Sequence, residues 1–435
     1  RFGTFPAGSV GYVITEEKFI PKNDFLTYLK VRASVGLVGN DNMSSHPDYR
    51  FLYLPDSYSI NNSDWLQQAY QDKNGYIFGL TNMAYQTAAK ELMLGNSNVT
   101  WETALKQNYG IDAYFFSDRL KLTVDYFREN RRDILIQRST VPSLIAMNGI
   151  LPVVNLGEVN NHGYEVDLKW NDHIRDFSYY INTNISYSKN KIIYQDEVEP
   201  NEPYMWRTGH EVGARFGYLA QGFYNEDDFD ADGNVRADLP QPQGKKYPGD
   251  IKFADLNGDN IIDTNDVKDI GYPTRPAYTF GLNYGINYKG WSLTMNWAGA
   301  AQRSLMLEQQ YRNYFNGKKG GLMMFHVNER WTPETESTAT LPRFSERSAS
   351  NNTQTSSVWI RNGNYLRLKT LQFGYTFTDR ELLKKIGISQ LTLTLSGYNL
   401  LTFTDFDILD PESRPGWGST YPVSRIYNLG LNITF

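Results

Sequence analysis

One acidic segment of this 435-residue chain has the side chains and the spacing of a calcium-binding loop. Between residues 255 and 266, oxygen-bearing side chains fall at the first, third, fifth, ninth and twelfth positions, and a backbone carbonyl is available at the seventh. Ca²⁺ prefers oxygen ligands, and this spacing wraps them around one ion. We therefore expect a structural Ca²⁺ site, with ligands from Asp255, Asn257, Asp259, the carbonyl of Ile261, Asp263 and Asp266.

This segment resembles the loops of EF-hands and, because Asp stands at the twelfth position, more closely those of dockerins. Asn260 occupies the place where Gly is usual, and Asn tolerates the left-handed conformation better than other residues. The alternative is a solvated acidic turn with Ile261 and Ile262 packed beneath it. A similar spacing upstream lacks the later ligands and predicts only a turn (Asp228, Asp230, Asp232 and Gly233, followed by Arg236 and Leu239).

Signals for catalysis are weak, and we expect no enzyme. The chain has no cysteine, which excludes disulfides, thiolate metal sites and cysteine nucleophiles. None of its five histidines lies in a His-Glu-x-x-His or similar ligand spacing (His46, His162, His173, His210 and His326). Acidic pairs are plentiful, so counting leaves a glycosidase dyad open, but nothing singles one out. A formal net charge of −5 argues against a nucleic-acid-binding protein, which usually concentrates positive charge.

Aromatic side chains in the polar connecting segments are candidates for binding a sugar or a peptide. Next to Asp, Asn and Arg, an exposed ring offers an apolar face beside hydrogen-bonding groups. Packing within the loops or at a membrane interface is the alternative for each of them. The candidate substrate-binding residues are Trp65, Tyr204, Trp206 and Trp417, and further loop tryptophans stand at Trp331 and Trp359.

The composition favours membrane-spanning strands for the elements that position these residues. Mean hydropathy is −0.53, yet 14% of the residues are aromatic, and no apolar run reaches the roughly 18 residues that a spanning helix needs. In a β-barrel only every second residue faces lipid, so the average is polar although the outer face is apolar. Aromatic residues then form the girdles at the two interfaces. A tyrosine-rich soluble sandwich is the alternative.

Alternation of apolar and polar residues is the dominant pattern, and it predicts about 11 antiparallel strands. A slip in the pattern between Leu368 and Leu371 predicts a bulge. Short connections alternate with long ones, as in outer-membrane barrels, whose long loops lie outside the cell. The expected short connections are 15–23, 117–118, 171–175, 289–290 and 379–389, and the long ones are 40–99, 138–157, 193–275, 302–357 and 405–420.

The last strand carries a further signal. An alternating apolar strand that ends the chain on an aromatic residue resembles the signal read by the bacterial barrel-assembly machinery, and an ordinary edge strand is the alternative (Tyr427, Leu429, Leu431, Ile433 and Phe435). Eleven strands are half of a 22-strand plugged transporter. Because the sequence starts at Arg1 within a strand-like segment, we expect residues 1–435 to be the C-terminal part of a barrel. The other strands and a plug would lie outside this chain.

Six segments, in order along nearly the whole chain, resemble the SusC/RagA-like TonB-dependent transporters of the Bacteroidetes outer membrane. They are 94–102 (LGNSNVTWE), 125–135 (DYFRENRRDIL), 155–165 (NLGEVNNHGYE), 249–259 (GDIKFADLNGD), 364–369 (NYLRLK) and 397–404 (GYNLLTFT) with 410–412 (DPE). The resemblance implies energised import of oligosaccharides or peptides and a SusD-like lipoprotein as a lid. It also implies a TonB complex as partner, although no TonB box lies in these residues. Two alternatives remain, a surface glycan-binding protein or adhesin on a barrel anchor, and a passive porin.

Overall fold

We describe the fold from a computed structural model of the chain. The description covers residues 2–21, 23–41, 51–56, 75–78, 84–142, 151–308, 311–312, 321–345, 351–377, 380–385, 387–413, 421 and 423–435. No helix in these ranges is long and apolar enough to cross a membrane.

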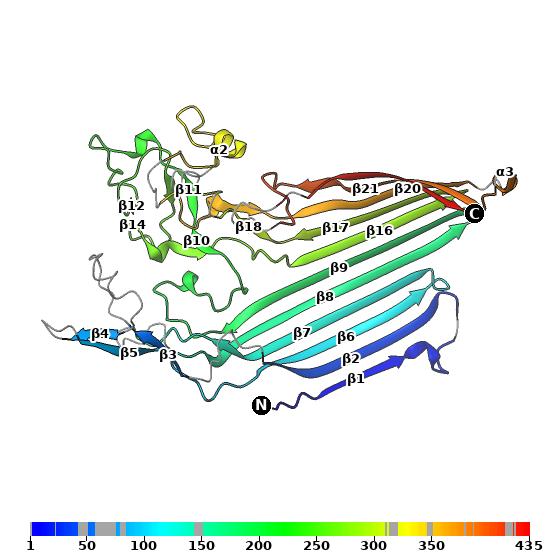
Figure 1. The fold of residues 1–435 in the computed structure, drawn as a ribbon, viewed down its shortest axis with the longest axis horizontal. Helices are drawn as coiled ribbons and strands as arrows, with labels where there is room; N and C mark the ends of the chain where they lie inside the picture. The colour runs from blue at the N-terminus through cyan, green and yellow to red at the C-terminus, as the bar shows by residue number, and fades with distance from the viewer. Residues whose placement is uncertain are drawn as a thin grey trace.

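An antiparallel sheet of eleven strands forms the body of the molecule, and its order follows the chain: β1-β2-β6-β7-β8-β9-β16-β17-β20-β21-β22 (Figure 1). The strands are β1 (Ala7–Val13), β2 (Leu26–Asn40), β6 (Glu102–Phe115), β7 (Leu120–Ile136), β8 (Val154–Ile174), β9 (Phe177–Tyr194), β16 (Tyr278–Tyr288), β17 (Trp291–Ala301), β20 (Tyr365–Phe377), β21 (Gln390–Thr404) and β22 (Ile426–Thr434). The predicted all-β class and strand number are confirmed. The sheet is open, with β1 and β22 at its two edges.

Short and long connections sort to opposite ends of the sheet, as predicted. The short turns and the C-terminus lie at one end, the turn end, and every long connection lies at the other, the loop end (Figure 1). Lys289 and Gly290 form a two-residue turn with φ of 45° and 86°, which suits the twist of a hairpin. Both bounds of β8 were wrong. It begins at Val154, inside the connection expected at 138–157, and it continues to Ile174 because its residues keep pairing with β9, so the turn is residues 175–176 rather than 171–175.

The predicted bulge is confirmed in β20. Pairing with β17 steps from Thr370 to Leu368, and pairing with β21 slips at the same place, so Lys369 is left outside both ladders. The extra residue restores the outward direction of the apolar side chains on either side of it.

The sheet has one apolar face and one polar face. Many of the apolar side chains that the alternation places on the outward face are exposed, including Ile111 (47%) and Leu395 (55%). Two aromatic rows border this apolar face. Consecutive cross-strand partners form a loop-end tyrosine row (Tyr109, Tyr126, Tyr164, Tyr187 and Tyr278). Others form a turn-end aromatic row (Phe177, Tyr288, Trp291 and Tyr375).

The distance between the two rows matches a membrane. On β16, ten residues separate Tyr278 from Tyr288. At about 3.3 Å per residue and a tilt near 40°, these residues rise about 25 Å along the membrane normal, the height of the apolar band of outer-membrane barrels. On this strand the two rows therefore have the separation expected of the two interfacial girdles.

The loop end carries a separate folded unit, which we call the loop domain, built from residues 195–277, 302–364 and 405–413 of the described chain (Figure 1). Its strands are β10 (Phe216–Tyr218), β11 (Ala220–Phe223), β12 (Gln241–Pro242), β13 (Ile251–Phe253), β14 (Ile261–Ile262), β15 (Val267–Asp269), β18 (Ser304–Met306) and β19 (Ile360–Asn362). Its helices are α2 (Met324–Glu329) and the 3-10 turns Pro203–Met205, Glu226–Asp228, Thr264–Asp266 and Ser357–Trp359. Outside it lie β3 (Leu52–Asp56), β4 (Gly75–Phe78), β5 (Ala84–Met93), α3 (Arg380–Lys385) and the 3-10 turn Ile14–Glu16.

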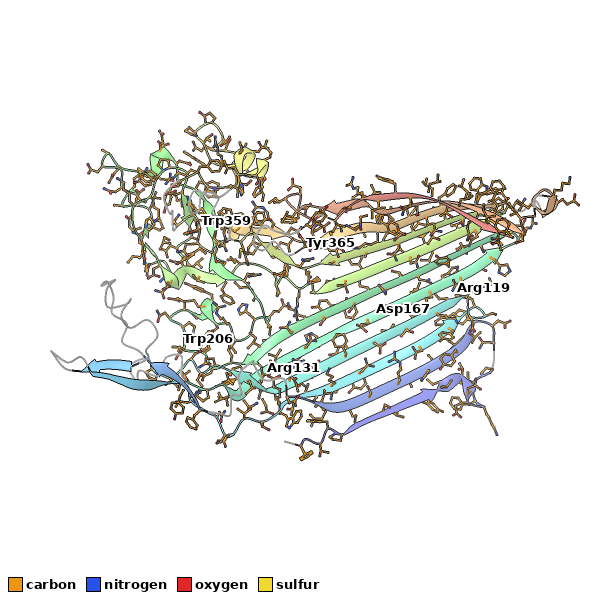
Figure 2. The ribbon with its side chains drawn as sticks, viewed as in Figure 1. Arg119, Arg131, Asp167, Trp206, Trp359 and Tyr365 are labelled. Atoms are coloured by element: carbon orange, nitrogen blue, oxygen red, sulfur yellow. The ribbon has the colours of Figure 1, made fainter. Side chains whose placement is uncertain are left out.

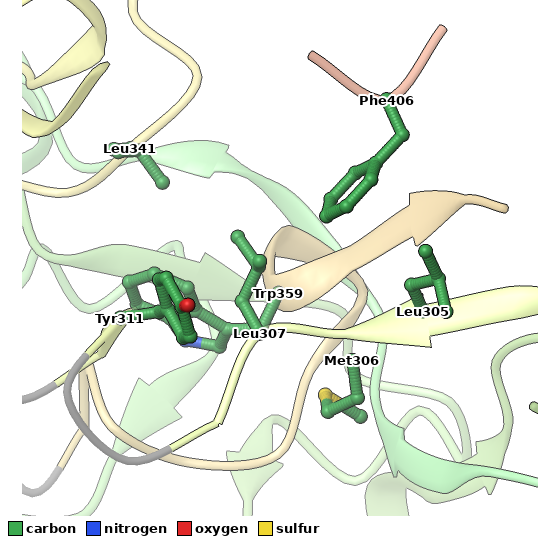
Figure 3. Close-up of a cluster of buried hydrophobic side chains, with 7 residues drawn as sticks. All are labelled: Leu305, Met306, Leu307, Tyr311, Leu341, Trp359 and Phe406. Carbon is green, nitrogen blue, oxygen red and sulfur yellow. The ribbon is translucent and has the colours of Figure 1, made fainter. Parts of the chain in front are cut away.

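The main hydrophobic core lies in this loop domain and not in the large sheet, whose two faces point to lipid and to the polar interior. Seven buried residues from four separate stretches of the chain pack together in the larger cluster (Figure 3; Leu305, Met306, Leu307, Tyr311, Leu341, Trp359 and Phe406). A smaller cluster joins Ile251, Phe253 and Ile262. The loop domain is thus held by its own core.

Candidate functional site: the polar face and the loop domain

The inward face of the large sheet is a continuous polar wall, and its residue types follow from the alternation. In the register of β7, β8, β9 and β16, each outward apolar row is separated from the next by an inward polar row. A hollow of about 320 Å³ opens on this wall and is lined mainly by carboxylate, amide and hydroxyl groups (Thr123, Asp125, Glu165, Asp167, Asn184, Ser186 and Thr279). Figure 2 shows Asp167 midway along the sheet, between Arg119 near the turns and Arg131 near the loops.

An ion-pair network fixes the carboxylates beside this hollow. The guanidinium of Arg32 on β2 donates through Nη2 to Asp125 Oδ2 at 2.5 Å and through Nε to Asp112 Oδ2 at 3.1 Å. The hydroxyl of Thr123 donates to the other Asp112 oxygen at 3.0 Å. Gly110 lies directly beneath the Arg32 side chain, where a Cβ would meet the guanidinium at 2.4 Å. One cation therefore serves two carboxylates, and a second cation, Lys169, lies 3.1 Å from Asp167 on the same wall.

A second network ties the last long connection to the inner wall. Arg367 on β20 is 3% exposed and donates to Glu412 at 2.6 Å and to Asp410 at 2.7 Å. Lys369, the bulge residue, donates to the same Glu412 at 2.6 Å, and the hydroxyl of Tyr365 donates to it at 2.9 Å. A buried guanidinium without its carboxylates is costly. The segment 410–412 is therefore held against the mouth of the wall.

Buried polar contacts also cross the loop domain. Asp250 is 3% exposed and accepts from Arg343 Nε at 2.7 Å and from the amide of Asn352 at 2.9 Å. Asn352 in turn accepts the backbone N–H of Ile251 at 3.0 Å. These bonds join residues about one hundred positions apart, so sequence reasoning missed them.

The predicted calcium loop is an ordered acidic turn whose carboxylates bond to its own backbone. Asp255 accepts the N–H groups of Gly258 and Asn260 at 2.7 and 2.8 Å. Asp266 is fully buried and accepts the N–H groups of Leu256 and Asp263 at 2.7 and 2.9 Å. These bonds draw the two ends of the loop together.

Two further features of this loop bear on the calcium prediction. Asn260 adopts φ of 64°, the left-handed conformation expected at the position where calcium loops usually carry Gly. Ile262 is buried beneath the loop, but Ile261 is 49% exposed. Within the described residues, no three acidic or histidine side chains are grouped so as to hold a metal ion. Calcium binding therefore stays a prediction. In the upstream spacing, Asp230 caps a turn by accepting the N–H groups of Asp232 and Asn234, as expected.

The aromatic residues of the connecting segments differ in how exposed their side chains are. Tyr204 is half-buried, and its hydroxyl donates to the carbonyl of Asn265 at 2.7 Å, which joins its segment to the acidic loop. Trp206 is partly exposed at the loop end (Figure 2). Both stay candidates for substrate contact. The further loop tryptophans Trp359 and Trp331 are 0% and 7% exposed, which matches the alternative of packing within the loops. Trp65 and Trp417 lie outside the described residues, as does His46.

Two adjacent acidic residues, Asp196 and Glu197, hold loops in place at the loop end of the polar wall, and the sequence did not predict this role. Asp196 accepts the N–H groups of Ser139 and Thr140 at 2.7 and 3.1 Å. Glu197 accepts those of Arg207 and Thr208 at 2.8 and 3.0 Å. Hydrogen bonds to the charged form lower the pKa of both carboxyls although burial opposes the shift. Each acid anchors a different loop just beyond β9.

The last strand has the predicted alternation and position. Tyr427, Leu429 and Phe435 are 72%, 74% and 87% exposed on the outward face. At its end, the hydroxyl of Ser389 donates to the carbonyl of Thr434 at 2.9 Å, next to the turn between β20 and β21. The assembly role of this strand stays a prediction.

Comparisons with known proteins agree with this architecture. The family model described as "TonB dependent receptor-like, beta-barrel" matches residues 3–400. TonB-dependent receptor P3 of Formosa agariphila is 28% identical over 100% of this chain and 42% of its own length. TonB-dependent receptor SusC of Bacteroides thetaiotaomicron is 25% identical over 100% of the chain and 40% of its own length. The chain thus spans less than half of these relatives.

Solved structures share the fold. The structure of the RagAB peptide transporter matches 99% of this chain and 43% of the compared chain, with a TM-score of 0.68 and 20% identity. The RagAB peptide importer in an "open-open" state matches with the same TM-score and 21% identity. This likeness covers both the large sheet and the loop domain, because it spans nearly the whole chain.

Proposed function

The chain belongs to the TonB-dependent receptor-like β-barrel family of outer-membrane transporters, and we propose that it forms part of the conduit wall of an active importer for oligosaccharides or peptides. Coupling to TonB and a SusD-like lipoprotein lid at the loop end complete the proposal. As in the sequence-based expectation, the plug and the remaining strands would come from other parts of a longer polypeptide.

The single observation that carries the proposal is the pairing of a polar, hollowed inner wall with a folded domain at its outer mouth. Sugars and peptides present hydroxyl, amide and charged groups, which the amides and carboxylates of the wall can bind along a path. The loop domain has its own core, so it offers a stable surface for a lid rather than a loose set of loops. The RagAB structures, described as a peptide transporter, support the peptide alternative for the substrate.

The test is an uptake experiment in cells that make the full-length protein. A strain lacking the gene is complemented with the wild type or with Glu165→Gln and Asp167→Asn combined, which neutralises two wall carboxylates. A matched control neutralises two loop-domain acids of the turn region, Asp230→Asn and Asp238→Asn. Uptake of labelled oligosaccharide and peptide pools is then measured with and without a protonophore.

We expect uptake of one pool to depend on the gene and to stop with the protonophore. The wall variant should change uptake more than the control variant. Uptake that continues without energy would identify a passive porin. Binding of a glycan at the cell surface without any gene-dependent uptake would support the adhesin alternative.

A further inference from the structure

The first charged residues on the outward face appear directly beyond the loop-end tyrosine row. The next outward row of cross-strand partners is Gln107, Arg128, His162 and Lys189, and the row after it ends with Lys191 on β9. Arg128, His162, Lys189 and Lys191 are all exposed. We call these four residues the basic row.

The basic row contrasts with the apolar face below it. From the tyrosine row toward the turns, the outward positions of β6, β7 and β8 are aliphatic or aromatic as far as Trp170 (Tyr109, Ile111, Ala113, Phe115, Leu120, Leu122, Val124, Tyr126, Tyr164, Val166, Leu168 and Trp170), and Asp172 near the turn is paired with Arg119. Positive charge therefore begins directly beyond the tyrosine row, on the side that faces the membrane.

These cations are not used inside the described part of the chain. There, Arg128, Lys189 and Lys191 form no ion pair with a carboxylate. Glu211 is the acid whose charge acts on Lys189, and Glu158 is an outward carboxylate two rows farther from the tyrosines. Positive charge is thus in excess at this level.

The level of the basic row is that of lipid headgroups. Arg128, His162 and Lys189 stand two residues beyond the tyrosines of their strands, which is about 7 Å along the strand and about 5 Å along the normal at the tilt of such barrels, and Lys191 stands two residues farther. Tyrosine girdles lie at the interface, and long cationic side chains reach from there to headgroups. Strands about 4.8 Å apart place Arg128, His162 and Lys189 within one headgroup's width.

We propose that the basic row binds the phosphate groups of anionic lipids in the outer leaflet. A phosphate accepts hydrogen bonds from guanidinium and ammonium groups, while the acyl chains of the same lipid cover the apolar face beneath. The inference depends on the outward orientation of the loop end and is independent of what the protein transports.

The test uses the full-length protein in detergent and measures lipid binding by native mass spectrometry. The variant is Lys189→Gln with Lys191→Gln, and the control is Lys245→Gln with Lys268→Gln, which removes the same charge from the loop domain. The probes are lipid A with two phosphates and its dephosphorylated form. Heat-dependent gel mobility verifies that every variant is folded.

We expect the wild type and the control to prefer phosphorylated lipid A, and the variant to bind it about tenfold or more weakly, since each cation near a charged lipid surface contributes about 1 kcal/mol. Equal binding by variant and control would overturn the proposal, as would equal binding of the two lipid forms. Displacement of the lipid by millimolar inorganic phosphate would assign the row to free anions instead.

Discussion

Arginine placed on the two faces of neighbouring strands should have opposite consequences, and the effect on the apolar face should depend on depth. Leu282 on β16 is four residues from Tyr278 and six from Tyr288, so it lies near the middle of the apolar band. Leu293 on β17 is only two residues from Trp291, about 7 Å along the strand from the turn-end row. Thr294 follows Leu293 and faces the polar wall opposite Gly285.

The magnitudes follow from those depths. Arginine at the midplane of an outer-membrane barrel costs about 2–4 kcal/mol, and near an interface about 0–1 kcal/mol. We therefore expect Leu282→Arg to destabilise the full-length protein by about 2–4 kcal/mol. Leu293→Arg should have a smaller effect, below the value for a midplane site, and Thr294→Arg should be tolerated.

Unfolding by denaturant in lipid vesicles, followed by tryptophan fluorescence and gel mobility, measures these differences. Each variant must first reach the membrane in the folded form, which heat-dependent mobility reports. The assignment of faces would be refuted by equal losses for Leu282→Arg and Thr294→Arg. A loss for Leu293→Arg as large as that for Leu282→Arg would refute the positions of the aromatic rows.

Three further predictions concern the strand end, the acidic turn and a loop anchor. Deletion of Phe435 should lower the amount of protein assembled in the outer membrane, and normal levels on quantitative blots would contradict the assembly signal. Asp255→Ala with Asp259→Ala should abolish a calcium-dependent gain in hydrogen-exchange protection of residues 225–275. If calcium gives no gain in the wild type, the turn is held by its own hydrogen bonds alone. The pKa of Asp196 is lowered by the bonds it accepts, so its contribution to stability is present above the ordinary pKa near 3.9 and is lost as the pH falls through the folded value. Asp196→Asn should therefore raise amide exchange at residues 139–140 at pH 7, and an unchanged rate would show that these amides are protected by other means.

The wall of the barrel could be predicted because each strand residue has only two environments. A side chain meets either lipid or the polar interior, so alternation alone specifies the faces, the strand number and the parity of the connections. Even the bulge at Lys369 was visible, because the alternation slips there. The ends of strands were harder to predict where inward and outward residues are both polar. This is why β8 was expected to end before Ile174.

The loop domain could not be predicted because its contacts join segments far apart in the chain. Trp359 packs with Leu305 and Phe406, and no local period marks it as a core residue. A tryptophan beside polar residues has the same local sequence whether it is buried or exposed. The conformation of turns could be predicted from local residue types, and the left-handed conformation of Asn260 is an example.

The segments that carried the family resemblance act as junctions between loops and wall. Asn155 donates to the carbonyl of Thr100 at 3.0 Å and to that of Asp133 at 2.7 Å. These two bonds join the segments 94–102, 125–135 and 155–165. Arg367 holds Asp410 in the same way. Side chains engaged in such bonds are occupied in holding the loops to the wall. Trp206 and the hollow residue Asp167 lie outside these segments, so we expect substitutions there to leave the junctions intact.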